Sequence, residues 1–97
     1  MGKDYIPYKI RNHYSVKRLL MLADKSVCYF VLYDDEEYHE YALYENMVYF
    51  CVSHKSKVKG MYLTQLIYRY RNNIKLDSYH LQDFIAVYRE HEVCLFT

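Results

Sequence analysis

The amino-acid sequence predicts an α+β fold: a single domain over residues 1–97 in which a three-stranded antiparallel meander, with a candidate for a short fourth strand, is covered on one face by about three helices. Two observations predict this class. The chain has 97 residues, 53% of them hydrophobic, with only two glycines and one proline, which suits one packed core and excludes an unfolded chain. Segments with helical spacing of apolar residues also flank apolar runs of strand length. Residues 1–12 are mostly polar and contain Pro7, so we expect them to form a flexible lead-in.

The first helix is predicted over residues 15–25. Ser15 is a favourable residue for the helix N-cap. The apolar residues that follow have the i, i+3, i+4, i+7 spacing of one helix face: Val16, Leu19, Leu20 and Ala23.

Three strands are predicted next, over residues 27–33, 38–44 and 47–53. The first has no polar residue and is rich in β-branched and aromatic side chains, which favours a central strand. An acidic run over residues 34–37 ends it. Only Glu45 and Asn46 separate the second strand from the third, which indicates a tight hairpin. Asn46 tolerates the positive φ of such a turn better than Glu45 does, so the turn type stays open.

Two further helices are predicted, over residues 61–72 and from about residue 78 to residue 91. Both show apolar residues at helical spacing. Asn72 and Asn73 can close the first helix, and Asp77 or Ser78 can cap the second. Residues 54–60 form a polar, basic connector, and residues 93–96 are the candidate for the short fourth strand.

Charge and cysteine content restrict the function classes. A net charge of +1 supplies no overall field to hold nucleic acid or an anionic membrane, and no apolar stretch approaches the length of a membrane span. The three cysteines are odd in number, which favours free thiols in a reducing compartment, although the sequence leaves one disulfide open. We therefore expect a soluble cytoplasmic protein that does not bind membranes.

Motifs of cofactor-dependent enzymes are absent from the sequence. With only Gly2 and Gly60, the chain can build neither a phosphate-binding loop nor a dinucleotide-binding fingerprint. Cys28 and Cys51 lie among apolar residues, unlike an activated catalytic thiol. We therefore expect no cofactor and no enzymatic activity.

A small zinc-stabilised domain is one alternative. Cys51 with His54, and His91 with Cys94, form two pairs of the ligand types that hold tetrahedral zinc. However, residues three apart on a strand point to opposite faces, and no glycine-containing knuckle separates the first pair. Buried thiols and solvated histidines are the competing interpretation.

An acidic surface is the leading candidate for a protein-binding site. The chain has fourteen tyrosines, and tyrosine is enriched at protein interfaces because it presents a large area at low entropic cost. The candidate anchors are the acidic run after the first strand and its neighbours: Asp34, Asp35, Glu36, Glu37, Tyr38, Glu40 and Tyr41. A solvated charged turn is the competing interpretation.

A second candidate site binds single-stranded nucleic acid. Lysines alternate along the connector, and tyrosine and arginine alternate along the helix after it: Lys55, Lys57, Lys59, Tyr68, Arg69, Tyr70 and Arg71. Phosphates attract the cations and unpaired bases stack on the rings. Because residues two apart on a helix lie about 200° apart, Arg69 and Arg71 cannot share one narrow face. A solvated loop and helix rim is the competing interpretation.

In its size, tyrosine content and lack of a cofactor motif, the chain is similar to short accessory proteins of viruses and mobile elements, including anti-CRISPR and anti-restriction proteins. This resemblance covers size and composition. It implies a non-enzymatic protein that inhibits or modulates a host nucleic-acid-processing or defence complex by covering part of its surface. Direct nucleic-acid binding is the alternative, and a homodimer formed through a strand edge or a tyrosine face could serve either role.

Overall fold

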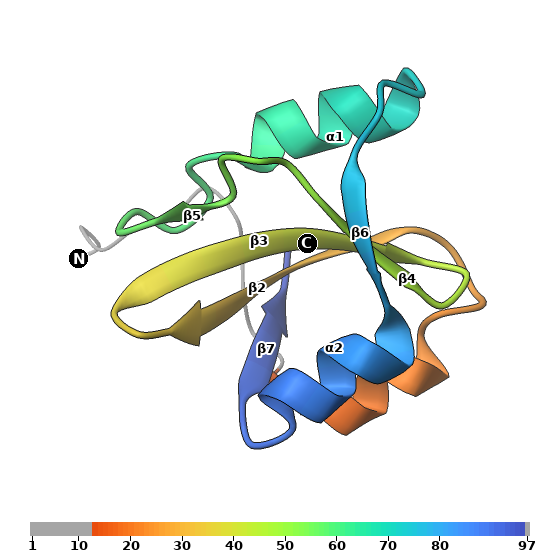
Figure 1. Cartoon of the computed structure of the whole chain (residues 1–97), viewed down its shortest axis with the longest axis vertical. Coiled ribbons are helices and arrows are strands. Elements are labelled where there is room, and N and C mark those ends of the chain that lie inside the picture. The colour runs from red at the N-terminus through yellow and green to blue at the C-terminus, as the bar shows by residue number, and fades with distance from the viewer. Residues whose placement is uncertain (1–12, 97) are drawn as a thin grey trace.

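The computed structural model describes residues 13–96 and confirms the α+β class (Figure 1). Its sheet has the strand order β1-β7-β2-β3-β4-β6, with β5 paired to β3 beside this path. The elements of the described range are β1 (His13–Ser15), the 3₁₀-helix η1 (Val16–Met21), β2 (Cys28–Asp34), β3 (Glu37–Tyr44), β4 (Met47–Phe50), β5 (Lys55–Ser56), α1 (Leu63–Arg71), β6 (Asp77–His80), α2 (Leu81–Tyr88) and β7 (Glu92–Leu95). The expected lead-in over residues 1–12 lies outside the described residues.

The predicted strand runs correspond to β2, β3 and β4, which pair antiparallel in chain order. The sheet is nevertheless larger than the sequence indicates, because β1, β5 and β6 are short and polar and carry no hydrophobic alternation. The predicted strand near the C terminus is β7, which lies between β1 and β2 rather than at an edge.

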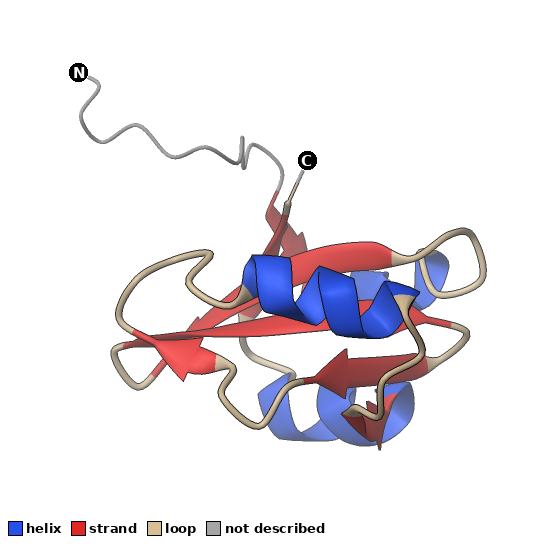
Figure 2. Ribbon diagram, turned by 90° about the horizontal axis from the view of Figure 1, so that it is seen from above, coloured by secondary structure: helices blue, strands red, loops and turns tan. Residues whose placement is uncertain are grey.

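Helices cover both faces of the sheet rather than one, with α1 on one side and α2 with η1 on the other (Figures 1 and 2). Side chains of β2, β3 and β4 alternate between the two faces. The larger buried cluster lies on the α2 side and consists of Val16, Leu19, Ala23, Phe30, Leu32, Tyr41, Leu43, Val48, Leu81, Phe84 and Val93. A smaller cluster lies on the α1 side and consists of Ala42, Cys51 and Leu66. Both faces of the central strands are therefore occupied, which explains the continuous apolar run of β2.

Two tight hairpins have positive φ at both central residues, as a type I′ turn requires. Asp35 and Glu36 have φ of 51° and 64°, and Glu45 and Asn46 have φ of 48° and 65°. The backbone N–H of Glu45 donates to the Ala23 carbonyl oxygen at 2.7 Å, which holds the second turn against the chain after η1. The predicted hairpin at residues 45–46 is confirmed, and the acidic run forms a second hairpin of the same kind.

The first helix is shorter than predicted and is a 3₁₀-helix, Val16–Met21. A 3₁₀-helix has three residues per turn, so Val16 and Leu19 share one face and are buried, whereas Leu20 turns outward and is 43% exposed. Ser15 occupies the N-cap position without a side-chain capping bond.

The predicted cap at Asp77 or Ser78 is wrong, because these residues belong to β6 and α2 begins only at Leu81. The apolar spacing of α2 is confirmed by the burial of Leu81 and Phe84. No helix in residues 13–96 combines the length and the apolar character needed to cross a membrane.

The helix α1 ends as the two asparagines predict. Asn73 has a φ of 55°, and the N–H groups of Asn73 and Ile74 donate to the carbonyls of Tyr70 and Arg69. This is the Schellman arrangement, which satisfies the last carbonyls of a helix. It turns the chain away from α1 and directs it toward β6.

Candidate binding site beside an edge strand

The third predicted strand stops at Phe50 instead of residue 53, and this interruption shapes the candidate site. The chain leaves the sheet at residues 51–53 and returns to β3 as β5. Two bonds hold this detour: the Glu40 N–H donates to the His54 carbonyl at 3.0 Å, and His54 Nδ1 donates to the Cys51 carbonyl at 2.8 Å. The detour leaves a gap between the sheet and α1.

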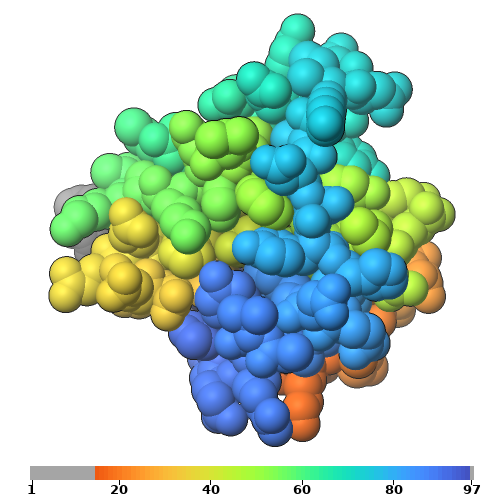
Figure 3. All heavy atoms as spheres, in the orientation of Figure 1, coloured from red at the N-terminus to blue at the C-terminus, as the bar shows by residue number. Residues whose placement is uncertain are grey.

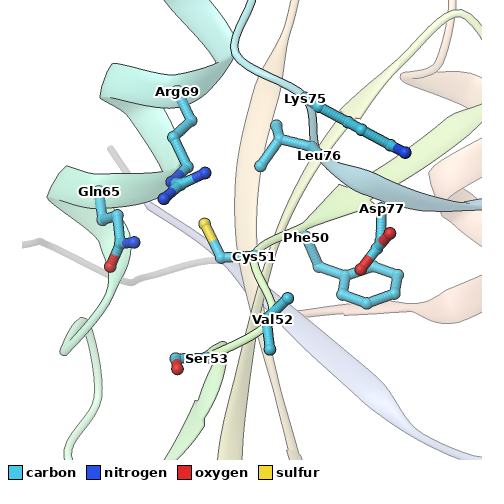
Figure 4. Close-up of a pocket in the computed structure, with 9 residues that line it drawn as sticks. All are labelled: Phe50, Cys51, Val52, Ser53, Gln65, Arg69, Lys75, Leu76 and Asp77. Carbon is cyan, nitrogen blue, oxygen red and sulfur yellow. The ribbon is translucent and has the colours of Figure 1, made fainter.

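A cleft of about 320 Å³ opens in this gap (Figure 4). Its walls come from the detour, from α1 and from the segment that leads into β6: Phe50, Cys51, Val52, Ser53, Gln65, Arg69, Lys75, Leu76 and Asp77. Arg69 reaches from α1 toward the Cys51 thiol, while Lys75 extends past Leu76 with its ammonium group away from the guanidinium (Figure 4). Val52 is 86% exposed at the surface beside the opening.

The charges around the cleft are two cations and one carboxylate, Arg69, Lys75 and Asp77. Within residues 13–96 the Arg69 guanidinium makes no hydrogen bond or ion pair. Burial raises the pKa of the Cys51 thiol, although the nearby Arg69 opposes this shift, so the thiol is neutral at physiological pH. The cleft therefore offers a half-buried arginine whose guanidinium has no ion-pair partner within residues 13–96.

The strand β6 runs along the edge of the sheet next to this cleft. Its four residues are all exposed, and β4 is its only strand partner within residues 13–96. The Leu81 N–H donates to the Asn46 carbonyl at 2.8 Å, and this bond shows which residues of β6 direct their N–H groups toward β4. Because inward and outward backbone groups alternate in an antiparallel pair, Tyr79 is bonded to β4, while Ser78 and His80 direct their N–H groups outward. Asp77, the first residue of β6, also lines the cleft.

The four residues of the zinc alternative do not meet. Cys51 packs on the α1 side of the sheet, whereas His54 contacts Tyr41 and Phe50 on the other side. His91 Nε2 lies 2.8 Å from Asp34 Oδ1, and Cys94 pairs across the sheet with Val31. No three potential metal ligands are grouped anywhere in the described part of the chain. The Cys-x-x-His spacing instead allows the hydrogen bond from the His54 ring to the Cys51 carbonyl, and none of the three cysteines forms a disulfide within residues 13–96.

Two of the expected acidic-surface anchors are buried, so the expectation that they are exposed is wrong. Tyr41 is 1% exposed and contacts the rings of Phe30 and Phe84 in the larger core. Glu40 is also 1% exposed, and its Oε1 accepts the Tyr62 N–H at 2.9 Å, just before α1. Alternation along β3 places these two side chains on opposite faces, and both faces are covered by helices.

The remaining acidic residues lie on or beside the first hairpin turn, next to the basic connector rather than apart from it (Figure 3). Asp35 and Glu36 are exposed, while Asp34, Glu37 and Tyr38 are half-buried. Ser56 pairs with Tyr38, and the Lys59 ammonium lies 5.4 Å from the centre of the Tyr38 ring. The exposed Lys55 belongs to β5 and pairs with His39, and the exposed Lys57 directly follows β5. Opposite charges are therefore mixed at this end of the molecule.

The tyrosine-arginine alternation of α1 is divided among three places. Arg69 lines the cleft described above. Tyr70 packs against Tyr44 and Tyr49 in a neighbouring depression. Tyr68 and Arg71 face outward in a third, shallow groove. No continuous row of cations and rings forms along α1, because adjacent residues on a helix are separated by about 100°.

A buried pair of histidines lies below the detour. The ring centroids of His39 and His54 are 6.0 Å apart, and the Tyr41 hydroxyl lies 3.4 Å from His39 Nδ1. Burial and the nearby Lys55 lower the pKa of both histidines, so both are neutral at physiological pH. They pack with the aromatic core and do not reach the cleft.

Sequence reasoning identified Arg69 but missed the other polar groups of the cleft, Ser53, Gln65, Lys75 and Asp77. They are scattered over the 25 positions from residue 53 to residue 77, with no spacing that a motif could reveal. No protein-family model, curated protein or solved structure matches the chain.

Proposed function

We propose that this protein is a small non-enzymatic binding protein that recognises an extended segment of a protein partner by adding it as a strand to β6. In this mode, backbone hydrogen bonds supply affinity and nearby pockets supply specificity. The supporting observation is an edge strand with four exposed residues and an outward N–H at Ser78 and at His80. Its residues are polar and it is short, which limits unselective edge pairing.

The partner class proposed from size and composition is a host nucleic-acid-processing or defence complex, which the protein would inhibit by covering part of its surface. Strand addition suits this role because it needs no cofactor and no catalytic group. Direct nucleic-acid binding has less support, because the cations and rings expected to form one surface lie in separate places.

A variant of Ser78 tests the docking strand. Proline at this position removes the outward N–H and leaves the inward bonds of Tyr79 to β4 in place. The probe is a peptide selected on the wild-type protein from a phage-displayed library of random linear peptides, then synthesised. Ser78→Pro should weaken its binding about tenfold, as expected for about 1.4 kcal/mol. Ser78→Ala, which keeps the N–H, should bind like the wild type.

Two further measurements make the test decisive. Binding of the peptide should slow hydrogen exchange at the amides of Ser78 and His80, a result that does not depend on whether Ser78→Pro folds. Solution mass of the free protein should not rise with concentration. The proposal is rejected if Ser78→Pro and Ser78→Ala bind equally and exchange at Ser78 is unchanged, if only a single-stranded oligonucleotide binds, or if β6 is occupied by a second copy of the chain.

A further inference from the structure

The cleft beside β6 holds a cationic group that has no hydrogen-bond or ion-pair partner among the described residues, and this observation extends the proposed function. Arg69 is half-buried, and within residues 13–96 its guanidinium makes neither a hydrogen bond nor an ion pair. A partly desolvated charge is stabilised most by an anion that enters the same cavity. Arg69 therefore indicates that the group bound in this cleft carries a negative charge.

The position of the cleft connects it to the docking strand. Asp77 is both the first residue of β6 and part of the cleft wall. A segment paired with the outer edge of β6 would therefore pass the mouth of the cleft at the N-terminal end of β6. A side chain from that segment could enter the cavity, whose volume of about 320 Å³ accommodates it.

On this basis, which rests on the proposed strand addition, we propose that the cleft is a specificity pocket for an aspartate or glutamate side chain of the bound segment, held by the Arg69 guanidinium. Guanidinium binds carboxylate through two parallel N–H···O bonds, a geometry that lysine cannot provide. Gln65 and Ser53 add polar groups to the wall, and Lys75 adds a second positive charge at the rim.

The carboxylate of Asp77 favours one orientation of the ligand. Asp77 lies on the wall beside Phe50, away from Arg69 in the close-up view (Figure 4). Glu40 is buried under the start of α1, where its Oε1 is engaged by the Tyr62 N–H. The incoming carboxylate would therefore lie on the α1 side of the cleft, near Arg69 and Gln65, where it avoids repulsion by Asp77.

Peptide selection measures the preference of the cleft for an acidic side chain directly. Peptides selected on the wild-type protein should share an aspartate or glutamate at one fixed position. Two peptides are then synthesised with amidated C termini, one with the acidic residue and one with the matching amide, so that the side chain supplies the only carboxylate compared. The acidic peptide should bind at least about tenfold more tightly to the wild type.

Arg69→Gln is the decisive variant, and Arg71→Gln is its matched control on the exposed side of the same helix. Arg69→Gln should abolish the difference between the two peptides and leave binding of the amide peptide unchanged, whereas Arg71→Gln should preserve the difference. This comparison isolates the coupling between the guanidinium and the carboxylate from any general effect on the fold.

The outcomes separate this inference from the proposed function. If binding depends on Ser78 but selected peptides show no acidic position, or if Arg69→Gln weakens both peptides equally, the carboxylate pocket is refuted and strand addition stands. If binding does not depend on Ser78, both proposals fail. Tight, strongly salt-dependent binding of a single-stranded oligonucleotide that is lost with Arg69→Gln would assign the cleft to phosphate and overturn the inference.

Discussion

At the scale of single residues, Glu40 shows how burial changes the role of a side chain. Its carboxylate lies under the start of α1, where Oε1 accepts the Tyr62 N–H, while Oε2 is buried and has no hydrogen-bond partner within residues 13–96. No side chain at the N-cap position itself caps α1, so Glu40 supplies the bond from the neighbouring strand. Burial raises the pKa of this carboxyl, although the backbone N–H groups of residues 60–62 oppose the shift.

The raised pKa of Glu40 predicts a pH-dependent effect of Glu40→Gln. The folded protein binds this proton more tightly than the unfolded chain does, so the stabilisation is complete below the ordinary pKa of 4.5 and is lost as the pH rises through the raised pKa. Glutamine keeps an acceptor for the Tyr62 N–H and does not ionise. The free energy of unfolding of Glu40→Gln should therefore increase relative to the wild type between about pH 4 and about pH 8, as measured by urea denaturation.

The control for this prediction is Glu40→Ala, which removes the acceptor as well as the charge. It should destabilise the protein by about 1–3 kcal/mol because the Tyr62 N–H is then buried without a partner. A difference between Glu40→Gln and the wild type that does not change with pH, or that falls as the pH rises, would show that the carboxyl titrates as it does in water.

At the scale of the elements, the two hairpins use residues that are unfavourable for their backbone conformation. Both turns need positive φ at two successive positions, and the chain places aspartate, asparagine and two glutamates there instead of glycine. A left-handed residue other than glycine costs about 1–2 kcal/mol. Pairing of all of β2 with residues 37–43 of β3 offsets this cost for the first turn.

Glu36→Gly should therefore stabilise the protein. Glycine removes the strain at a φ of 64°, and its greater freedom in the unfolded chain offsets part of the gain, leaving about 0.5–1 kcal/mol. Gln82→Gly, at an exposed position in α2, should instead lower the free energy of unfolding by about 1 kcal/mol. Equal effects of the two glycines in denaturant titrations would contradict the explanation by backbone strain.

At the scale of the whole molecule, two cores share one sheet. The larger core lies under α2 and η1, and the smaller lies under α1. Neighbouring residues of β3 serve both, since Tyr41 belongs to the larger cluster and Ala42 to the smaller. Loss of packing on one face therefore weakens the strands that support the other, and we expect both faces to unfold together.

Phe84→Ala tests this coupling. Phe84 is fully buried and contacts Phe30 and Tyr41, so the substitution should cost about 3–5 kcal/mol. Tyrosine fluorescence and far-UV circular dichroism should show one coincident transition at a lower denaturant concentration. Val87→Ala, on the exposed side of α2, should change the free energy of unfolding by less than about 0.5 kcal/mol. The coupling is disproved if amides of α1, such as Leu66, stay protected from hydrogen exchange after the α2 side has unfolded.

The features predictable from the sequence are those encoded by neighbouring residues. The run of residues 27–33 predicted β2 because it is apolar on both faces, and the spacing of Leu63 and Leu66 predicted the buried side of α1. The separation of two strands by Glu45 and Asn46 predicted the hairpin, and Asn73 predicted the end of α1. Each signal comes from local backbone preference or from a period along the chain, so it needs no knowledge of the fold.

The candidate site depends on contacts between distant parts of the chain, and the sequence by itself did not determine it. β6 has no hydrophobic alternation, and it is a strand only because it pairs with β4. Arg69 lines the cleft only because the chain leaves the sheet after β4, at residues 51–53. Burial of Glu40 and Tyr41 likewise follows from helices that return over both faces of β3. The sequence determined which segments are helical or extended, whereas tertiary packing decided which charges and rings meet solvent, because exposure depends on neighbours far away along the chain.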